Sequence, residues 1–416
     1  MTERQLVILG GGAAGLSAAI EAKKNGIGDV LVIERNSCFG GVLRQCIHDG
    51  FGLHKYKENL TGVEFAERVT QDAIRAGVEF LPDTFVVDFH DRILTLVSKT
   101  EGLMQIQAEA VILAMGCRER PRGSLLIPGS RCAGILTAGT AQKLLNLEGY
   151  LPGKRAVILG SGDIGLIMAR QLTVEGVKVE HVVEIMPYSS GLARNMLQCV
   201  EDFDIPVSYN CTVTQIKGTK RVEAVTVARV DEKRRVLPGT EWEIPCDCLI
   251  LSVGLIPENE LSNRAGLEIS PSTKGATVDD LLMTTAEGVF ACGNVLHVHD
   301  LVDFVAEEGE RAGRSAAEYL KNRPAATECI FVREGAGVGG IVPQRIRTEG
   351  SGKIRFMFRP KEWIRDARVC IYRNGERTAV IPKRILTPGE MCSFDVEREK
   401  LSGASDILVC VEKGDR

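Results

Sequence analysis

The segment from Gln5 to Glu34 constrains the fold more than any other part of the chain. It runs from an apolar strand through G-x-G-x-x-G at Gly10, Gly12 and Gly15 into a helical stretch, then a second apolar strand that ends in Glu34. This order is typical of a βαβ unit that binds a dinucleotide. The glycines let the loop approach a pyrophosphate, and the helix N-terminus offers free N–H groups to it. Glu34 is placed to accept ribose hydroxyls.

A second copy of this pattern lies 150 residues further along the chain. A strand that ends in glycine also occurs twice, at residues 112–116 and 250–254. Because two separate landmarks recur in the same order, the sequence predicts two dinucleotide-binding domains of the same plan. The landmarks of the second fingerprint are Gly160, Gly162, Gly165 and Glu184.

Composition and charge exclude several classes of protein. The net charge of −4 provides no basic field for nucleic acid. No apolar run approaches the ~20 residues of a membrane helix, and the first strand begins too early for a signal peptide. We therefore expect a cytoplasmic protein without a transmembrane segment. The 13 cysteines contain no Cys-x-x-Cys pair, so we expect buried free thiols and no metal or iron–sulfur site.

Residues 5 to about 320 resemble the pyridine nucleotide–disulfide oxidoreductase superfamily, the flavoproteins with two dinucleotide-binding domains. Four motifs carry the resemblance: the two fingerprints, the strand that ends at Gly116, and residues 289–294 before a helix. Residues 115–123 and 290–300 are also similar to a narrower group. These are flavoprotein subunits associated with anaerobic glycerol-3-phosphate dehydrogenase, cyanide synthase, opine dehydrogenase and sarcosine oxidase.

The resemblance implies that the first fingerprint holds FAD and the second holds NAD(H). It also implies an α/β fold with two Rossmann-like domains of the three-layer ββα type. The FAD domain would comprise residues 1–117 and 286–325, and the NAD domain residues 118–285. The expected FAD contacts are Gly10, Gly12, Ala13, Ala14, Gly15, Glu34, Arg35, Gly41, Val42, Ala114, Gly116, Gly293 and Asn294. The expected NAD contacts are Gly160, Gly162, Asp163, Ile164, Gly165, Glu184 and Gly254.

The sequence after about residue 320 has a different pattern from the two dinucleotide-binding domains. Residues 321–327 look like a linker, and short strands with turns follow, which predicts a small all-β C-terminal domain at 328–416. This domain carries no metal spacing and no phosphate loop. We expect it to dock a partner protein, or to form a homodimer interface as in the disulfide reductases.

Two departures from the superfamily pattern bear on the chemistry. Asn294 stands where the superfamily usually has aspartate, and an amide still hydrogen-bonds a ribityl hydroxyl or a phosphate. The redox pair Cys-x4-Cys after Gly41 is absent, since only Cys46 follows there. We therefore do not expect dithiol chemistry. Glu184, with no arginine at residues 185–188 to pair a 2′-phosphate, favours NADH over NADPH.

Three groups of side chains are candidates for chemistry beside the flavin. Cys46 has Arg44 and His48 as neighbours, which would lower its pKa and favour a reactive thiolate, although a structural thiol is the alternative. His297 and His299 precede the long helix and would tune the flavin or move a proton, unless they form a polar turn. A third candidate is a pair of arginines that would form a hinge salt bridge or contact a nucleotide phosphate: Arg118 and Arg120.

These observations favour an FAD-dependent NAD(H) oxidoreductase. We expect it to exchange electrons with a partner dehydrogenase that handles glycerol 3-phosphate or an amino or imino acid. Two alternatives stay open. One is a single-cysteine NADH oxidase or peroxidase that uses Cys46. The other is a non-catalytic accessory component whose nucleotides are structural.

Overall fold

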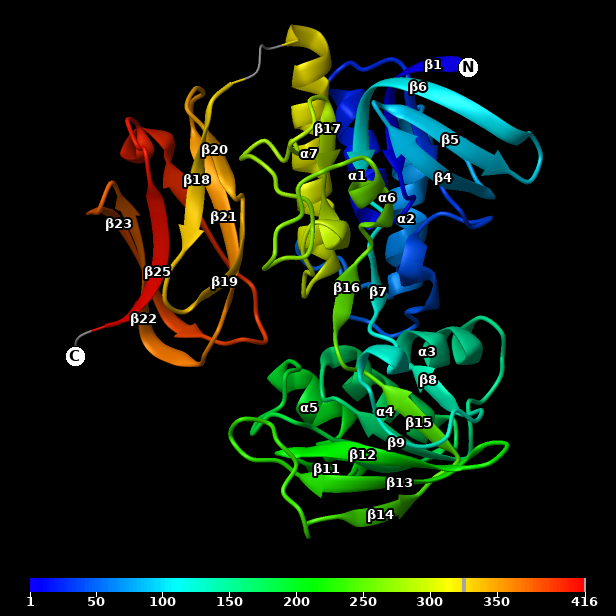
Figure 1. The fold of residues 1–416 in the computed structure, drawn as a ribbon. Coiled ribbons are helices and arrows are strands. Elements are labelled where there is room, and N and C mark those ends of the chain that lie inside the picture. Colours follow the sequence, from blue (N-terminus) through cyan, green and yellow to red (C-terminus); the bar gives the residue numbers. More distant parts are fainter. Residues whose placement is uncertain (324–326, 415–416) are drawn as a thin grey trace. The chain divides into compact units, whose positions relative to one another are not determined.

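The computed structural model describes residues 1–323 and 327–414, so the middle of the expected linker lies outside the described residues. The chain divides into two compact units (Figure 1). The first unit comprises Met1–Cys117 and Pro257–Arg416, and the second comprises Arg118–Ile256. Each unit is described by itself below. In the described part of the chain, no helix combines the length and the apolar character needed to cross a membrane.

The first unit is built on a seven-stranded sheet. The strand order is β3-β2-β1-β6-β5-β4, and β17 pairs with β6. The pairs formed by β1, β2, β3, β6 and β17 are parallel, whereas β4 and β5 add an antiparallel edge. Residues 6–9 of β1 are buried because both faces of this central strand are covered. The strands are β1 (Thr2–Leu9), β2 (Val30–Ile33), β3 (Glu79–Leu81), β4 (Thr84–His90), β5 (Ile93–Ser98), β6 (Gly102–Leu113) and β17 (Val289–Ala291).

Two helices of this unit cross at very short range, the first after β1 and the second near residue 310. Gly309 and Gly313 lie against the carbonyl oxygens of Ala14 and Ala18, so that a Cβ at either glycine would overlap the facing backbone. Small residues therefore allow this close contact. The helices of the unit are α1 (Ala13–Lys24), α2 (Gly62–Arg75), α6 (Glu260–Arg264) and α7 (Val302–Asn322), with short 3-10 turns η1 (Gly41–Gln45) and η4 (Gly293–Val295).

Residues 257–285 group with the first unit, whereas the sequence placed them in the NAD-binding segment 118–285. Their polar contacts explain this position. The side-chain amide of Asn259 donates to the carbonyls of Lys274 and Val295, both at 2.9 Å. Arg264 donates to the carbonyl of Val87 at 2.8 Å. The compact boundary therefore falls near residue 256.

The C-terminal region is a two-sheet β sandwich with its own apolar core. A five-stranded sheet of order β20-β18-β25-β22-β23 packs on a three-stranded sheet of order β19-β21-β24. Phe356 and Phe394 stack at 5.3 Å between ring centroids within this core. The strands are β18 (Cys329–Glu334), β19 (Val338–Val342), β20 (Arg345–Arg347), β21 (Lys353–Pro360), β22 (Ile364–Arg373), β23 (Glu376–Leu386), β24 (Cys392–Glu397) and β25 (Ile407–Lys413), with a 3-10 turn η5 (Arg398–Leu401).

The sandwich is joined to the rest of the first unit by ion pairs. Arg355 pairs with Glu307 at 3.0 Å, and Arg359 pairs with Asp300 at 2.6 Å. Arg398 pairs with Asp280. One face of the sandwich is therefore occupied within this chain.

The second unit repeats the dinucleotide-binding plan. Its five-stranded parallel sheet has the order β11-β10-β9-β15-β8, with helices on one face and a three-stranded antiparallel sheet on the other. This is the predicted three-layer ββα arrangement. The elements are η2 (Arg122–Ser124), β8 (Ile135–Thr137), α3 (Ala138–Asn146), β9 (Arg155–Leu159), α4 (Asp163–Val174), β10 (Lys178–Val183), α5 (Ala193–Cys199), η3 (Glu201–Phe203), β11 (Val207–Ser208), β12 (Cys211–Gly218), β13 (Val222–Arg229), β14 (Trp242–Pro245) and β15 (Cys248–Leu251). Two short strands span the ends of this unit in the sequence: β7 (Cys117–Glu119) and β16 (Leu255–Pro257).

Candidate nucleotide-binding sites and a histidine–glutamate cluster

The carboxylate of Glu34 is buried at the end of β2, beside the first glycine loop. Oε2 accepts from the N–H of Gly11 at 2.9 Å. Oε1 accepts from the N–H and the side-chain amide of Asn36, at 2.9 and 2.8 Å. These three donors occupy three of the about four lone-pair positions of a carboxylate. Glu34 therefore fixes the loop, and its remaining acceptor position is compatible with the expected contact to a ribose hydroxyl.

Glu184 repeats this arrangement in the second unit. It is buried at the end of β10, and Oε2 accepts from the N–H and hydroxyl of Ser161, at 2.8 and 2.6 Å. Oε1 accepts from the N–H of Met186 at 2.8 Å. Ser161 and Met186 stand 150 residues after Gly11 and Asn36, so the repeated sequence spacing corresponds to repeated hydrogen bonds.

The glycines of the first fingerprint fall into two kinds. A Cβ at Gly10 would overlap the carbonyl oxygen of Ala114, and a Cβ at Gly15 would overlap the carbonyl oxygen of Gly10. At Gly12, in contrast, a Cβ would meet no atom within 4 Å, and no side chain caps α1 there. The space beside the helix N-terminus fits a pyrophosphate. The N–H groups of the first turn, those of Ala13 and Ala14, would donate hydrogen bonds to it.

The second fingerprint has the same two kinds of glycine. Gly160 and Gly165 lie too close to backbone for a side chain, whereas the nearest neighbour of a Cβ at Gly162 is the Ser190 hydroxyl at 3.8 Å. Asp163, in the first turn of α4, accepts from the Leu192 N–H at 2.8 Å and from the Asn195 amide at 2.7 Å. Asp163 thus holds the loop that follows β10. Ile164, beside it, is half-buried.

The other predicted nucleotide contacts lie at the start of η1 and at the ends of the two strands that finish in glycine, at residues 112–116 and 250–254. Gly41, Gly116 and Gly254 all have positive φ, and a Cβ at Gly116 or Gly254 would meet no atom within 4 Å. Ala114 is buried against Gly10. Two predicted contacts have exposed side chains: Arg35 and Val42.

Cys46 lies in a setting opposite to the one expected. Burial raises the pKa of its thiol to about 12, and the thiol contacts the carbonyl of Val42 at 3.4 Å. His48 donates from Nδ1 to the carbonyl of Asp49 at 2.9 Å and packs on Phe51. The expected lowering of the Cys46 pKa is therefore wrong, because burial disfavours the charged thiolate.

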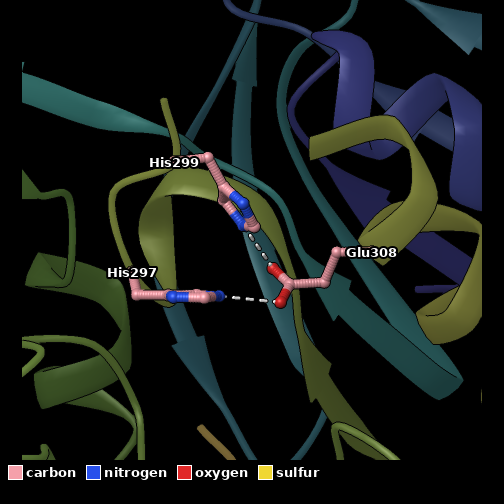
Figure 2. Close-up of side chains that lie close together, drawn as sticks. All are labelled: His297, His299 and Glu308. Atoms are coloured by element: carbon pink, nitrogen blue, oxygen red, sulfur yellow. Dashed lines mark hydrogen bonds and ion pairs between the residues drawn. The ribbon is translucent and has the colours of Figure 1, made fainter. Parts of the chain in front are cut away.

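His297 and His299 converge on Glu308, which lies in α7 (Figure 2). Nε2 of His297 lies 2.8 Å from one carboxylate oxygen, and Nε2 of His299 lies 3.1 Å from the other. Burial lowers the pKa of His297. Burial also tends to raise the pKa of Glu308, but the two histidines hold it well below its ordinary value. Nδ1 of His297 is buried without a hydrogen-bond partner among the described residues.

The same cluster organises the predicted FAD contacts Gly293 and Asn294. The N–H of Gly293 donates to Glu308 at 2.6 Å. Oδ1 of Asn294 accepts from the N–H of His299 at 3.0 Å, and the Asn294 amide contacts the thiol of Cys117 at 3.6 Å. Asn294 is thus held in place by the chain itself. The candidate arginines Arg118 and Arg120 are exposed.

Two organising residues were missed by reasoning from the sequence. Asp303 accepts from the N–H groups of Gly52, His54 and Lys55 at 2.8–3.1 Å, and so fixes the loop after η1. Glu308 is the second. Its signal was available, because Glu308 follows Val305 by three residues and precedes Ala312 by four, which places it on the apolar stripe of α7.

The fold and these sites define an oxidoreductase with two dinucleotide-binding domains. The chain belongs to the pyridine nucleotide-disulphide oxidoreductase family, whose model matches residues 4–316. Its cofactors are FAD and a nicotinamide nucleotide. The family membership expected from the motifs is confirmed at this level, and so is the α/β fold class.

Known proteins match most of the chain. It is 27% identical to hydrogen cyanide synthase subunit HcnB of Pseudomonas aeruginosa, over 82% of this chain and 73% of that protein. It is 25% identical to an opine oxidase subunit of Agrobacterium tumefaciens, over 75% of this chain and 64% of that protein. The thioredoxin reductase structure of T. acidophilum shares the fold, with a TM-score of 0.62 and 23% identity, over 76% of this chain and 99% of that one.

Proposed function

We propose that this chain is the NADH-linked flavoprotein component of a dehydrogenase complex. It would exchange electrons with a partner protein that handles glycerol 3-phosphate or an amino or imino acid. The observation that carries the proposal is the pair of buried carboxylates, Glu34 and Glu184, each bonded to its own glycine loop. One chain thereby provides two nucleotide sites.

The residues of the first site have separate tasks. The open side of Gly12 and the N-terminus of α1 would hold the pyrophosphate of FAD, and Glu34 would accept a hydrogen bond from a ribose hydroxyl. Asn294, oriented by His299, presents an amide at the end of η4. When bound, FAD would supply the hydride exchange with the nicotinamide and the onward electron transfer.

The second site favours NADH. A 2′-phosphate would meet the side chain of Glu184 at the position where a 2′-hydroxyl would donate a hydrogen bond. Residues 185–188 contain no arginine that would pair such a phosphate. Repulsion of the phosphate therefore supports the assignment of NAD(H).

The second acceptor is proposed to lie on another chain. The only cysteine just after Gly41 is Cys46, whose raised pKa makes it a poor nucleophile and disfavours an oxidase or peroxidase based on it. Two of the relatives named above are subunits of hydrogen cyanide synthase and opine oxidase. Both points support a flavoprotein that works with a partner protein.

The C-terminal sandwich is our proposed docking domain. Its face toward α7 is already engaged through Arg355 and Arg359. On the far edge of the five-stranded sheet, β23 exposes Val380 and Ile385, which are 43% and 46% exposed. An edge strand with exposed apolar side chains suits pairing with another chain.

Substitutions on β23 test this proposal better than removal of residues 328–416, which would also break the ion pairs to α7. The double variant Val380→Asp, Ile385→Asp is expected to lose its partner during purification from its own cell while NADH–dye activity is unchanged. Leu103→Asp, at a 74% exposed residue of β6, is the matched control. Loss of a homodimer instead of a heteromer would favour the homodimer alternative. Unchanged assembly would contradict docking through β23.

A further inference from the structure

The histidine–glutamate cluster has the composition of a metal site. Two imidazoles and one carboxylate form a common ligand set for divalent transition-metal ions, used for zinc and for non-haem iron. Here the set comprises His297, His299 and Glu308, all of them buried. Their ligand atoms lie within 4.8 Å of one another, and no other group of this kind is found among residues 1–323 and 327–414.

The geometry brings the ligand atoms to one point. Figure 2 shows both imidazole rings directed at the carboxylate of Glu308 from the loop before α7. The two Nε2 atoms approach different carboxylate oxygens, at 2.8 and 3.1 Å. Two atoms that each bind a metal at about 2.0–2.2 Å are separated by roughly 3 Å when the angle between the bonds is near 90°. Small shifts would therefore admit an ion between the three side chains.

A small cavity adjoins the cluster and has room for a further ligand. It measures about 20 Å³, which accommodates about one water molecule, and His299 and Glu308 form part of its wall. The charges around it are mixed, since Glu307, Arg311 and Arg355 also line it. Arg355 is neutralised by Glu307 and Asp395. The ligand set, rather than a strongly negative field, would select the ion.

We propose that His297, His299 and Glu308 bind one divalent first-row transition-metal ion, with water from the adjacent cavity as a further ligand. The N–H of Gly293 would remain bonded to Glu308 as a supporting contact of the kind that orients metal-binding carboxylates. The ion would tie the loop that carries Asn294 to α7. This inference does not depend on the proposed function, because its test measures metal and not NADH oxidation.

The experiment uses the FAD-loaded, full-length protein and Zn²⁺ as the probe. The protein is dialysed against a chelator, equilibrated with Zn²⁺ and examined by elemental analysis and by X-ray absorption at the zinc edge. We expect about one zinc per chain with only nitrogen and oxygen ligands at about 2.0–2.2 Å. A sulfur shell near about 2.3 Å would mean binding by some of the 13 cysteines. That result, or less than about one tenth of an equivalent of zinc, would overturn the proposal.

Variants distinguish a metal site from a cluster that is held together only by hydrogen bonds. In His299→Gln the amide still donates to Glu308 but is a poor zinc ligand, so zinc affinity should fall by at least about 100-fold while the fold is kept. His90→Gln is the control, because His90 is exposed and pairs only with Asp91 among the described residues. Equal zinc affinity in all three proteins would overturn the proposal. If His299→Gln does not fold, the ligand shell that X-ray absorption measures in the unaltered protein still tests the proposal.

Discussion

The backbone of Gly15 lies against the carbonyl oxygen of Gly10, so that any side chain at position 15 would overlap it. This contact closes the first glycine loop onto α1. Gly12, three residues earlier, faces open space instead. Gly15 therefore serves the fold, whereas we propose that Gly12 serves cofactor binding.

Alanine at these two glycines should separate stability from cofactor binding. We expect Gly15→Ala to lower the free energy of unfolding by roughly 2–4 kcal/mol, because the backbone must move. Gly12→Ala should leave the melting temperature of the apoprotein unchanged but reduce the FAD content, because the methyl group occupies the pyrophosphate space. Calorimetry and the flavin-to-protein absorbance ratio measure the two effects. Normal FAD content in Gly12→Ala would refute the placement of the pyrophosphate.

Nucleotide preference should depend on Glu184. We expect the second-order rate constant of flavin reduction to be at least about tenfold higher for NADH than for NADPH, which corresponds to about 1.4 kcal/mol. Glu184→Gln should reduce this ratio because the charge that repels the 2′-phosphate is gone. Glu175→Gln, at an exposed residue just after α4, is the control. Anaerobic stopped-flow mixing gives the rates, and faster reduction by NADPH in the unaltered protein would show that the specificity is misassigned.

Cys46 should be slow to alkylate. A pKa raised to about 12 by burial leaves very little thiolate at pH 8. Because only the thiolate reacts, we expect iodoacetamide to modify Cys46 at least about 100-fold more slowly than the exposed Cys38, with a rate that rises about tenfold per pH unit. Peptide mass spectrometry measures both sites in one sample. Comparable rates at the two cysteines would restore the single-cysteine alternative.

Asp279 should make stability depend on pH. Burial, with the neighbouring Asp280, raises its pKa from 3.8 to about 6. A raised carboxyl pKa favours the protonated form. The stabilisation of the folded protein by this bound proton is therefore complete below about pH 4 and is lost as the pH rises through 6. Between pH 4 and pH 8, the free energy of unfolding of Asp279→Asn should therefore rise by roughly 2–3 kcal/mol relative to that of the unaltered protein. Urea unfolding measures this, with Asp202→Asn, at an exposed residue, as control. A difference that does not vary with pH would exclude a raised pKa.

Much of the fold was accessible from the sequence because the dinucleotide-binding unit is defined by local signals. The strand, the glycine loop and the acidic residue recur at a spacing of 150, and the structure repeats their hydrogen bonds at the same spacing, from Gly11–Glu34 to Ser161–Glu184. The all-β character of the C-terminal domain was equally accessible, through its short alternating strands, but its arrangement as two packed sheets was not.

What sequence reasoning missed depends on tertiary contacts that local sequence patterns do not specify. The end of the second unit near residue 256 follows from the side-chain bonds of Asn259, which local pattern does not reveal. The high pKa of Cys46 reflects the burial of its thiol in the folded chain, which the neighbouring sequence does not show. The histidine–glutamate cluster needed α7 to bring Glu308 beside a loop 9–11 residues earlier in the chain.

The proposed function requires that NADH reduces a flavin bound to this chain. Anaerobic titration of the FAD-loaded protein with NADH, followed by flavin absorbance, measures this reduction. We expect complete bleaching with one NADH per flavin, and recovery of the colour when an artificial electron acceptor is added. A yellow protein that binds NADH but does not bleach would exclude hydride transfer to the flavin and favour an accessory component with structural nucleotides.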